Sequence, residues 1–301
     1  MTQRGLLLFG LMSVVWGIPY FFIRVAVAEV TPATLVFGRA AIAAAILLPI
    51  AITRVDLRAV LRRWRWVAAF AVAEIGIPWV LLASAEQHVS SSLAGLLVAG
   101  VPLVGSVIAF ATGGADRLGR TGLIGLLVGL AGVVAIVGGD FTASDATALL
   151  EVGVVVVGYA IGPAILARRL SGQSNVAVMA FSLSLCALAY APVAFIQRPA
   201  TLPSAGALGA VVVLGLVCTA AAFLLFWALI EEIGPVRSTV ITYLNPAVAA
   251  VLGIVVLSES FTIVMGLGFG LVILGSLLAT RPVGAGRAAE PARRPEAAAL
   301  P

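Results

Sequence analysis

The chain has 301 residues, of which 62% are hydrophobic and only 10% are charged. Its mean hydropathy is +1.17. Soluble domains carry about 25% charged residues and roughly half apolar ones, so this composition excludes a water-soluble fold. The formal net charge is +5, and all 18 basic residues are arginines scattered among short segments. This distribution excludes the continuous basic face of a nucleic-acid-binding protein and predicts an integral membrane protein.

Ten apolar stretches fill the chain between residues 5 and 280, and each is about long enough to cross a bilayer as a helix. They lack the alternating polar and apolar pattern of a membrane β-barrel. A helix satisfies its own backbone hydrogen bonds in lipid, so we expect an all-α integral membrane protein with ten transmembrane helices. The expected spans are 5–28, 32–53, 66–85, 90–112, 122–139, 148–167, 176–196, 205–230, 238–257 and 261–280.

The arginines predict how the chain is oriented. If the N-terminus faces the cytoplasm, 15 of the 18 arginines lie in cytoplasmic segments, and the opposite side holds only Arg198. Arginine-rich loops stay cytoplasmic, so both termini are predicted to be cytoplasmic. Lysine-free usage rich in Ala, Gly and Val suggests a bacterial genome, and therefore the bacterial cytoplasmic (inner) membrane. Residues 281–301, rich in Ala, Pro, Arg and Gly, are predicted to form a disordered cytoplasmic tail.

The two halves of the chain, residues 5–139 and 148–280, resemble each other at an offset of 143 to 144 positions. Each half contains five expected spans. Because five is odd, the second copy enters the membrane from the opposite side, which gives an inverted repeat of the kind found in secondary transporters. The matching segments are Trp16-Gly17-Ile18 with Tyr159-Ala160-Ile161, Val101-Pro102-Leu103-Val104 with Asn245-Pro246-Ala247-Val248, and Gly125 and Gly132 with Gly268 and Gly275.

A set of short motifs resembles the EamA domain: Trp16-Gly17 in the first span, Pro32 followed by Arg39 in the second, Asn245-Pro246 in the ninth, and Glu259 before a Gly-x6-Gly helix. Two such domains in tandem make the ten-helix branch of the drug/metabolite transporter superfamily. The resemblance covers residues 5 to 280. It implies a secondary transporter with a central cavity between the repeats, and substrates that range over amino acids, metabolites, sugars and drugs and are often exported.

The first copy departs from this pattern at two places. It has Asp116 where the second copy has Glu259, and it lacks the asparagine of Asn245-Pro246.

Glu74 lies near the middle of the third expected span. A charged carboxylate at that depth costs several kcal/mol, so it must pair, face water or stay protonated. It is either a proton-coupling and substrate-binding carboxylate or half of a buried ion pair that fixes the packing of the helices. Its counterpart at the repeat offset is Val217 or Cys218, so only one half carries the carboxylate.

Other residues are candidates for binding substrate. Arg39, inside the second span, could hold a carboxylate-bearing substrate by its bidentate guanidinium group or form a structural ion pair. Trp16 and Tyr20 are spaced by four residues and share one helix face. They could line a cavity for amphipathic or aromatic solutes, or they could pack against lipid and neighbouring helices. The further candidates are Trp79, Tyr243 and Asn245, and Phe223, Phe226 and Trp227 are weaker ones.

Prolines interrupt several spans, and Pro102 and Pro246 match across the repeats while Pro19 and Pro163 nearly do. A proline bends a helix and frees a backbone carbonyl. Paired interruptions indicate a midplane binding site, so these four residues are candidate hinges for alternating access. They are equally compatible with static kinks.

The sequence therefore predicts a secondary active transporter that moves a small organic metabolite, amino acid-like or drug-like, by alternating access with proton-coupled efflux. The alternative is a membrane scaffold or sensor with an occluded core and no flux. We expect no enzyme, cofactor or metal site, because the sequence has no P-loop, no Ser/His/Asp set and no metal-ligand spacing. The expected partners are a small-molecule substrate, membrane lipid and protons, and the protein is expected to act as a monomer or a homodimer.

Overall fold

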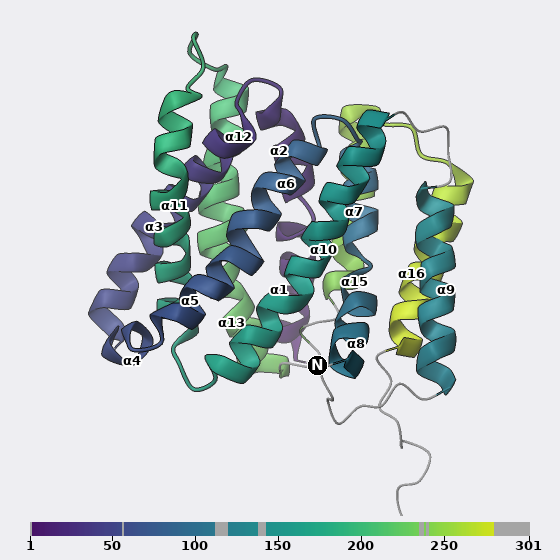
Figure 1. Ribbon diagram of the computed structural model, residues 1–301, viewed down its shortest axis with the longest axis horizontal. Coiled ribbons are helices and arrows are strands. Elements are labelled where there is room, and N and C mark those ends of the chain that lie inside the picture. Colours follow the sequence, from purple (N-terminus) through teal and green to yellow (C-terminus); the bar gives the residue numbers. More distant parts are fainter. Residues whose placement is uncertain are drawn as a thin grey trace, which may run out of the picture.

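The structure, a computed structural model, describes residues 2–55, 57–111, 120–137, 143–234, 238 and 241–279. Every regular element in these ranges is a helix, as the composition predicts (Figure 1). Asp116 and the tail 281–301 lie outside the described residues. Eight helical segments are long and apolar enough to cross a membrane, and two shorter apolar helices of 17 residues follow near the C-terminus.

The first half of the chain forms helices that stand roughly side by side (Figure 1). They are α1 (Gln3–Val15), α2 (Pro19–Val27), α3 (Pro32–Arg54), α4 (Leu57–Leu61), α5 (Trp64–Phe70), the π-helical segment η1 (Ala71–Gly76), α6 (Ile77–Ala85), α7 (Ser91–Val98), α8 (Val101–Ala111) and α9 (Arg120–Val137).

The second half forms a similar series. It consists of α10 (Ala143–Arg169), α11 (Asn175–Ile196), α12 (Ala205–Gly215), the π-helical segment η2 (Leu216–Ala221), α13 (Ala222–Ile233), α15 (Ile241–Leu257) and α16 (Ile263–Ala279).

Serine and threonine side chains begin many of these helices. In each case the hydroxyl oxygen accepts a hydrogen bond from the backbone N–H three residues later, which satisfies one of the free donors of the first turn. These residues explain why the helices start where they do. They are Thr2, Thr31, Ser90, Ser174 and Ser204.

Two expected spans are interrupted. The first breaks at Trp16–Ile18, just before Pro19, and the fourth breaks at Ala99–Gly100, just before Pro102. A proline is tolerated in the first turn of a helix but cannot continue the turn before it, so each break has a local cause. The sixth span starts at Ala143, five residues earlier than the expected boundary of 148.

The two halves pack mainly against each other. Among the pairs that join them are α1 with α13, α2 with α12, α3 with α11, α6 with α10, α7 with α15, and α9 with α16. The last pair stands at one edge of the molecule (Figure 1). There the glycines Gly125, Gly132, Gly268 and Gly275 meet backbone atoms of the opposite helix, and an added Cβ would overlap them. The glycines therefore permit backbone contact between the two halves.

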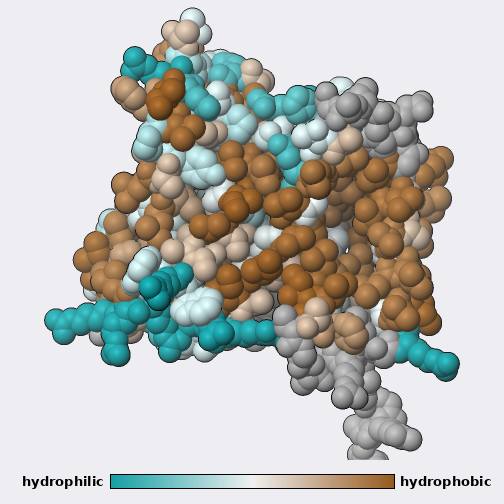
Figure 2. All heavy atoms as spheres, viewed as in Figure 1, coloured by the Kyte–Doolittle hydropathy of each residue, from teal (hydrophilic) through white to brown (hydrophobic). Residues whose placement is uncertain are grey.

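A broad apolar belt covers the face shown in Figure 2, and hydrophilic side chains gather along the lower edge of that view. Large apolar side chains are strongly exposed, such as Leu127, Val255 and Ile263. Exposure on this scale would be unfavourable in water and is what a lipid-facing surface requires. Both cysteines, Cys186 and Cys218, are buried and form no disulfide with each other.

Candidate functional site

Glu74 is the fourth residue of the π-helical segment η1. The widened turn is visible in the hydrogen bond from the N–H of Ile77 to the carbonyl of Val72, five residues back. A π-helical turn inserts an extra residue and leaves carbonyl groups without their usual donors, and such turns are frequent at functional sites. Two side chains of α11 satisfy carbonyls of η1: Tyr190 donates to Gly76 (2.9 Å) and Cys186 donates to Ala71 (3.6 Å).

A cavity of about 600 Å³ lies between the two halves, and Glu74 is one of its lining residues. Its wall includes Leu166 and Ala167 in the last turn of α10 and Asn175 at the start of α11, so it reaches the end of the molecule where Arg168 and Arg169 lie. Its wall is mostly apolar and aromatic. The polar or aromatic lining residues are Trp16, Tyr20, Phe70, Glu74, Tyr159, Asn175, Phe223, Phe226, Trp227, Thr242 and Asn245.

An aromatic cluster forms one wall of the cavity. The ring centroid of Trp16 lies 4.7 Å from that of Phe226 and 5.8 Å from that of Phe223, with the second pair edge to face. The Phe223 and Trp227 centroids are 6.4 Å apart. Trp16 comes from the break between α1 and α2, whereas the other three rings project from α13, so both halves build this wall.

Glycines on α10 hold Glu74 close to that helix. A Cβ at Gly162 would overlap Oε2 of Glu74, and a Cβ at Gly158 would overlap the carbonyl oxygen of Ala73. Side chains larger than hydrogen at these positions would push η1 away from α10. The Oε2 atom of Glu74 is buried, and no described residue gives it a hydrogen bond. The carboxyl group is therefore positioned by packing and keeps an open hydrogen-bonding site.

Asn245 lies on α15 directly before Pro246, and both line the cavity. In the amide orientation that suits its neighbours, the side-chain nitrogen donates to the carbonyl of Ser13 (3.1 Å) and to that of Ile241 (2.9 Å). Ile241 is four residues before Asn245, and the ring of Pro246 disturbs the backbone bonding of this turn. Asn245 thus ties α15 to α1 and stabilises the disturbed turn.

Arg39 and Trp79 lie together, but neither is among the residues that line the cavity. The guanidinium carbon of Arg39 is 3.7 Å from the centre of the Trp79 ring, which is a close cation–π contact. Its Nε donates to the hydroxyl of Thr219 at 2.9 Å. Arg39 is buried, and this contact joins α3 to η2 of the other half.

The other end of the molecule is closed by contacts between loops and helix ends. Arg24 donates to the backbone carbonyl of Glu86. Gln87 donates to the carbonyl of Val27 at 3.5 Å. The Glu86 side chain is fully buried, and among the described residues neither of its carboxyl oxygens has a hydrogen-bond partner. None of the residues in these contacts lines the cavity.

Glu259 closes the same end from the second half. Its carboxylate accepts four hydrogen bonds of 2.5 to 2.9 Å from the N–H and hydroxyl groups of Ser91 and Ser92, at the start of α7. Partial burial raises the pKa of this carboxyl, but the four donors lower it by more, so the net pKa lies below the ordinary value. Glu29 makes a similar contact with the N–H and hydroxyl of Ser204 at the start of α12, and these hydrogen bonds lower its pKa.

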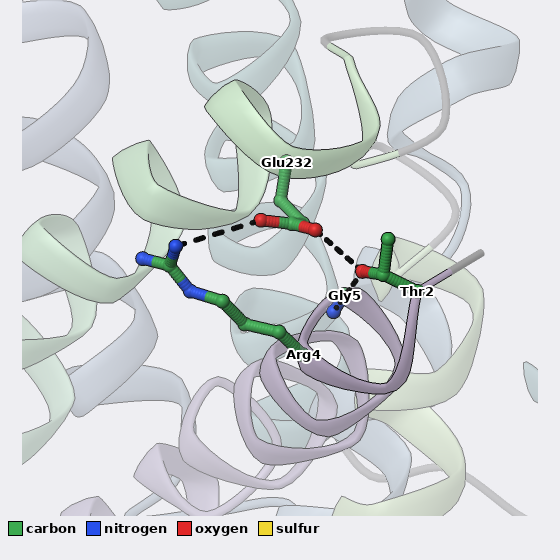
Figure 3. A network of polar contacts seen from close by, with 4 residues as sticks. All are labelled: Thr2, Arg4, Gly5 and Glu232. Carbon is green, nitrogen blue, oxygen red and sulfur yellow. Dashed lines mark hydrogen bonds and ion pairs between the residues drawn. The ribbon is translucent and has the colours of Figure 1, made fainter.

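A third carboxylate joins the halves at the arginine-rich end (Figure 3). Glu232, near the end of α13, accepts a hydrogen bond from the hydroxyl of Thr2 and lies 3.7 Å from Nη1 of Arg4. Thr2 also caps α1 through the N–H of Gly5 (3.0 Å). The contact joins α1 to α13 beside the cavity, and Arg4 is 72% exposed, so this link is accessible to water.

The predicted site residues thus fall into two groups. Trp16, Tyr20, Glu74 and Asn245 meet in the cavity with Pro163 and Pro246, whereas Arg39, Trp79, Tyr243, Pro19 and Pro102 lie outside its lining. Pro19 and Pro102 follow helix breaks, and Pro163 and Pro246 lie inside continuous helices.

Sequence reasoning missed Tyr159, which lines the cavity from α10. The signal was present, because the repeat aligns Tyr159 with Trp16. The glycines that hold Glu74 were also missed, although Gly158 and Gly162 have the small-xxx-small spacing that permits close helix contact.

The chain matches the model of the EamA-like transporter family twice, over residues 3–138 and 147–281. It is 25% identical over 274 residues to the uncharacterized inner membrane transporter YedA of Escherichia coli strain K12, a match that covers 89% of this chain and 88% of YedA. The YedA proteins of strains O6:H1 and O157:H7 match to the same extent. One solved crystal structure superposes with a TM-score of 0.65 at 22% identity, covering 93% of this chain and 97% of the other. That likeness concerns the fold alone.

Proposed function

The chain belongs to the EamA-like transporter family of the drug/metabolite transporter superfamily, and from this premise we propose that it is a proton-coupled secondary transporter that exports a small organic cation or amphipathic solute. The observation that carries the proposal is the 600 Å³ cavity with Glu74 in its wall. The alternative, a scaffold or sensor with an occluded core, predicts a packed interior between the two halves, so the cavity favours transport.

The cavity's lining supports a substrate class. Aromatic rings dominate one wall, Glu74 supplies a carboxyl group, and among the described residues no basic side chain lines the cavity. Aromatic faces attract cations, and a carboxylate in a low-dielectric site pairs best with a positive group. An amine-bearing, partly apolar solute fits this lining better than an anion does. Amino acid-like substrates would bind here through their ammonium group rather than through a carboxylate clamp at Arg39.

Coupling follows from competition for one carboxyl group. Glu74 has an open hydrogen-bonding position at Oε2. A proton or a cationic solute can neutralise the carboxylate, but both together would leave excess positive charge in a low-dielectric cavity. The two ligands therefore exclude each other. If the carboxyl group releases the solute and takes up a proton on the outside, and does the reverse inside, protons that enter down their gradient drive the solute outward.

The pairing of helices supports an inverted repeat of five spans per half. The first segment of one half packs on the third of the other, as α2 with α12, and the same relation recurs in reverse as α10 with α6. Three further pairs join equivalent segments, α3 with α11, α7 with α15 and α9 with α16, as a two-fold relation requires. With the arginine-rich end in the cytoplasm, the cavity faces inward and the end closed by Glu86 and Glu259 faces outward. Alternating access then requires that closure to open while the arginine-rich end closes.

Transport in proteoliposomes tests the proposal. Purified protein would be reconstituted with a tetraphenylphosphonium-type or amine-bearing aromatic probe inside, and efflux would be followed with and without an imposed pH gradient. We expect gradient-driven efflux for the wild type and none for Glu74→Gln. The control is Glu151→Gln, which removes a carboxyl group on α10 that accepts from Ser84 (2.8 Å) and does not line the cavity. Full gradient-driven flux in Glu74→Gln would refute the coupling role, and no flux for any probe class would favour the scaffold.

A further inference from the structure

A recess of about 390 Å³ lies at the arginine-rich end, separate from the central cavity. Five arginines and two tryptophans line it, and none of its lining residues is acidic. The two sides come from different halves of the chain: the segment that begins α5, and the end of α10. We call this the arginine recess. Its lining residues are Arg62, Arg63, Trp64, Arg65, Trp66, Arg168 and Arg169.

Contacts across the arginine recess hold its two sides together. Arg63 donates through Nη1 to the backbone carbonyl of Arg169. The guanidinium carbon of Arg169 lies 4.5 Å from the centre of the Trp66 ring, and that of Arg65 lies 5.8 Å from the centre of Trp64. These cation–π and hydrogen-bond contacts orient the guanidinium groups of Arg63, Arg65 and Arg169 around the recess. All five arginines are exposed, so water and salt screen their mutual repulsion, and an anion placed among them would be attracted by several positive charges at once.

A second recess of about 320 Å³ adjoins the first. It is lined by Ala59, Arg62, Arg63 and Gln173, so the two recesses share Arg62 and Arg63. Guanidinium groups bind phosphate oxygens through paired N–H donors. Two adjoining recesses with shared arginines suit a ligand that carries two phosphate groups a short distance apart.

The position of the arginine recess indicates where the phosphates come from. Trp64 is 61% exposed and Trp66 is 39% exposed, and both begin a helix that runs into the apolar belt. Tryptophan at this position is typical of the membrane–water interface. Figure 2 shows hydrophilic side chains at the lower left edge, below that belt. Leu61 and Val72, on either side of the tryptophans in sequence, are also exposed and would contact acyl chains.

We propose that the arginine recess binds the headgroup of an anionic phospholipid, with a preference for a two-phosphate headgroup of the cardiolipin type. The lipid would bridge the α4–α5 segment of the first half and the α10–α11 connection of the second. A soluble phosphate or diphosphate has the same headgroup chemistry but lacks acyl chains, so the two sources can be told apart by experiment. This proposal does not depend on the transported substrate or on proton coupling.

Binding would be measured on the full-length protein in detergent by native mass spectrometry and by thermal shift. The lipid probes are cardiolipin, phosphatidylglycerol and phosphatidylcholine, and the soluble probes are inorganic phosphate and pyrophosphate. We expect affinity and thermal stabilisation to rank cardiolipin above phosphatidylglycerol and both above phosphatidylcholine. Millimolar phosphate or pyrophosphate should neither stabilise the protein comparably nor displace the lipid.

The variant Arg62→Gln/Arg168→Gln should weaken cardiolipin binding roughly thirtyfold, because each arginine near an anionic lipid contributes about one kcal/mol. The charge-matched control Arg54→Gln/Arg120→Gln removes two arginines that do not line the recess, and it should change binding less than about threefold. The variant Arg62→Lys/Arg168→Lys preserves charge and shows whether a weakened variant is still folded. Equal losses in the test and control pairs, no preference over phosphatidylcholine, or full displacement by pyrophosphate would each overturn the proposal.

Discussion

The segments η1 and η2 occupy the same place in the two halves, and both are π-helical, but their chemistry differs. The fourth residue of η1 is Glu74, which faces the cavity, and the fourth residue of η2 is Thr219, which is buried. Thr219 accepts a hydrogen bond from Arg39 and donates to the carbonyl of Leu214 (2.8 Å), so it satisfies a carbonyl that the widened turn leaves free. Both halves therefore share the π-helical turn, but only the first half has an ionisable residue at this position.

The counterpart of Glu74 depends on how the two halves are aligned. The repeat offset of 143 to 144 positions predicts Val217 or Cys218, whereas a residue-by-residue match of the two π-helical segments gives Thr219. Both halves contain the widened turn, so the turn itself does not change the offset between them. The conclusion that only one half carries the carboxylate is unaffected.

The largest effect is expected when a substitution in η1 is compared with one at the equivalent position of η2. Glu74→Gln should reduce gradient-driven efflux by at least about tenfold, within the range of a coupling free energy. Thr219→Val should leave the dependence on the pH gradient intact, because its hydroxyl does not line the cavity. The measurement is efflux from proteoliposomes at several imposed gradients. Equal loss of coupling in both variants would show that the two π-helical segments contribute alike.

Thr219→Val should instead reduce stability. It leaves the buried Nε of Arg39 and the carbonyl of Leu214 without their described partner. Loss of a hydrogen bond to a buried charged group costs about 1.5–3 kcal/mol. Thermal unfolding in detergent should show a lower midpoint for this variant, and Arg39→Met should lower it by a similar amount. The double variant should cost less than the sum, because the two residues share one interaction.

A smaller effect is expected from the glycine that seats Glu74. Gly162→Ala would place a methyl group against Oε2 of Glu74 and should move the carboxyl group, lowering efflux severalfold while the protein stays folded. Gly153→Ala on the same helix is a matched control, because no atom lies within 4 Å of its added Cβ. Efflux equal to wild type in Gly162→Ala would mean that η1 adjusts without consequence.

The smallest effect is expected on the pH dependence of thermal stability, through Glu259 at the closed end. The folded-state pKa of Glu259 lies below its ordinary value, so its hydrogen bonds stabilise the fold above the ordinary carboxyl range and are lost as pH falls through the lowered pKa. The thermal midpoint of wild type should therefore fall at acid pH by more than that of Glu259→Gln. At neutral pH the substitution should cost less than about 1 kcal/mol, because the site is partly exposed and screened. If the thermal midpoints of the two proteins fell in parallel with pH, the hydrogen bonds of Glu259 would not stabilise the closed end.

Much of the fold could be predicted, because lipid leaves few choices. Apolar length set the spans. The glycines that match between the fifth and tenth spans lie in the contact between α9 and α16, a pairing that the sequence alone did not predict. The breaks before Pro19 and Pro102 follow from proline's missing N–H. The π-helical segments could not be predicted, since the sequences of 71–76 and 216–221 contain no residue type that demands an extra residue in the turn.

The site was predicted less completely. A charged residue in an apolar span indicates a polar environment, but the sequence does not show whether that environment is a cavity or a packed contact between helices. Both interpretations were therefore open for Glu74 and for Arg39. Only the packing separates them: Glu74 lies in the cavity wall, and Arg39 lies against Trp79 and Thr219. Tyr159 had no signal of its own beyond the repeat, because an aromatic residue in an apolar span is usually a packing residue.

The backbone contact between α9 and α16 also constrains how the protein is made. Gly132 of α9 meets Gly268 of α16, the last described helix of the chain. At usual translation speeds the ribosome needs on the order of ten seconds to synthesise the intervening chain. During that interval the glycine face of α9 is in the bilayer without its partner, so membrane insertion and assembly are separated in time. A chain that lacked α16 would leave this glycine face of α9 without its partner helix.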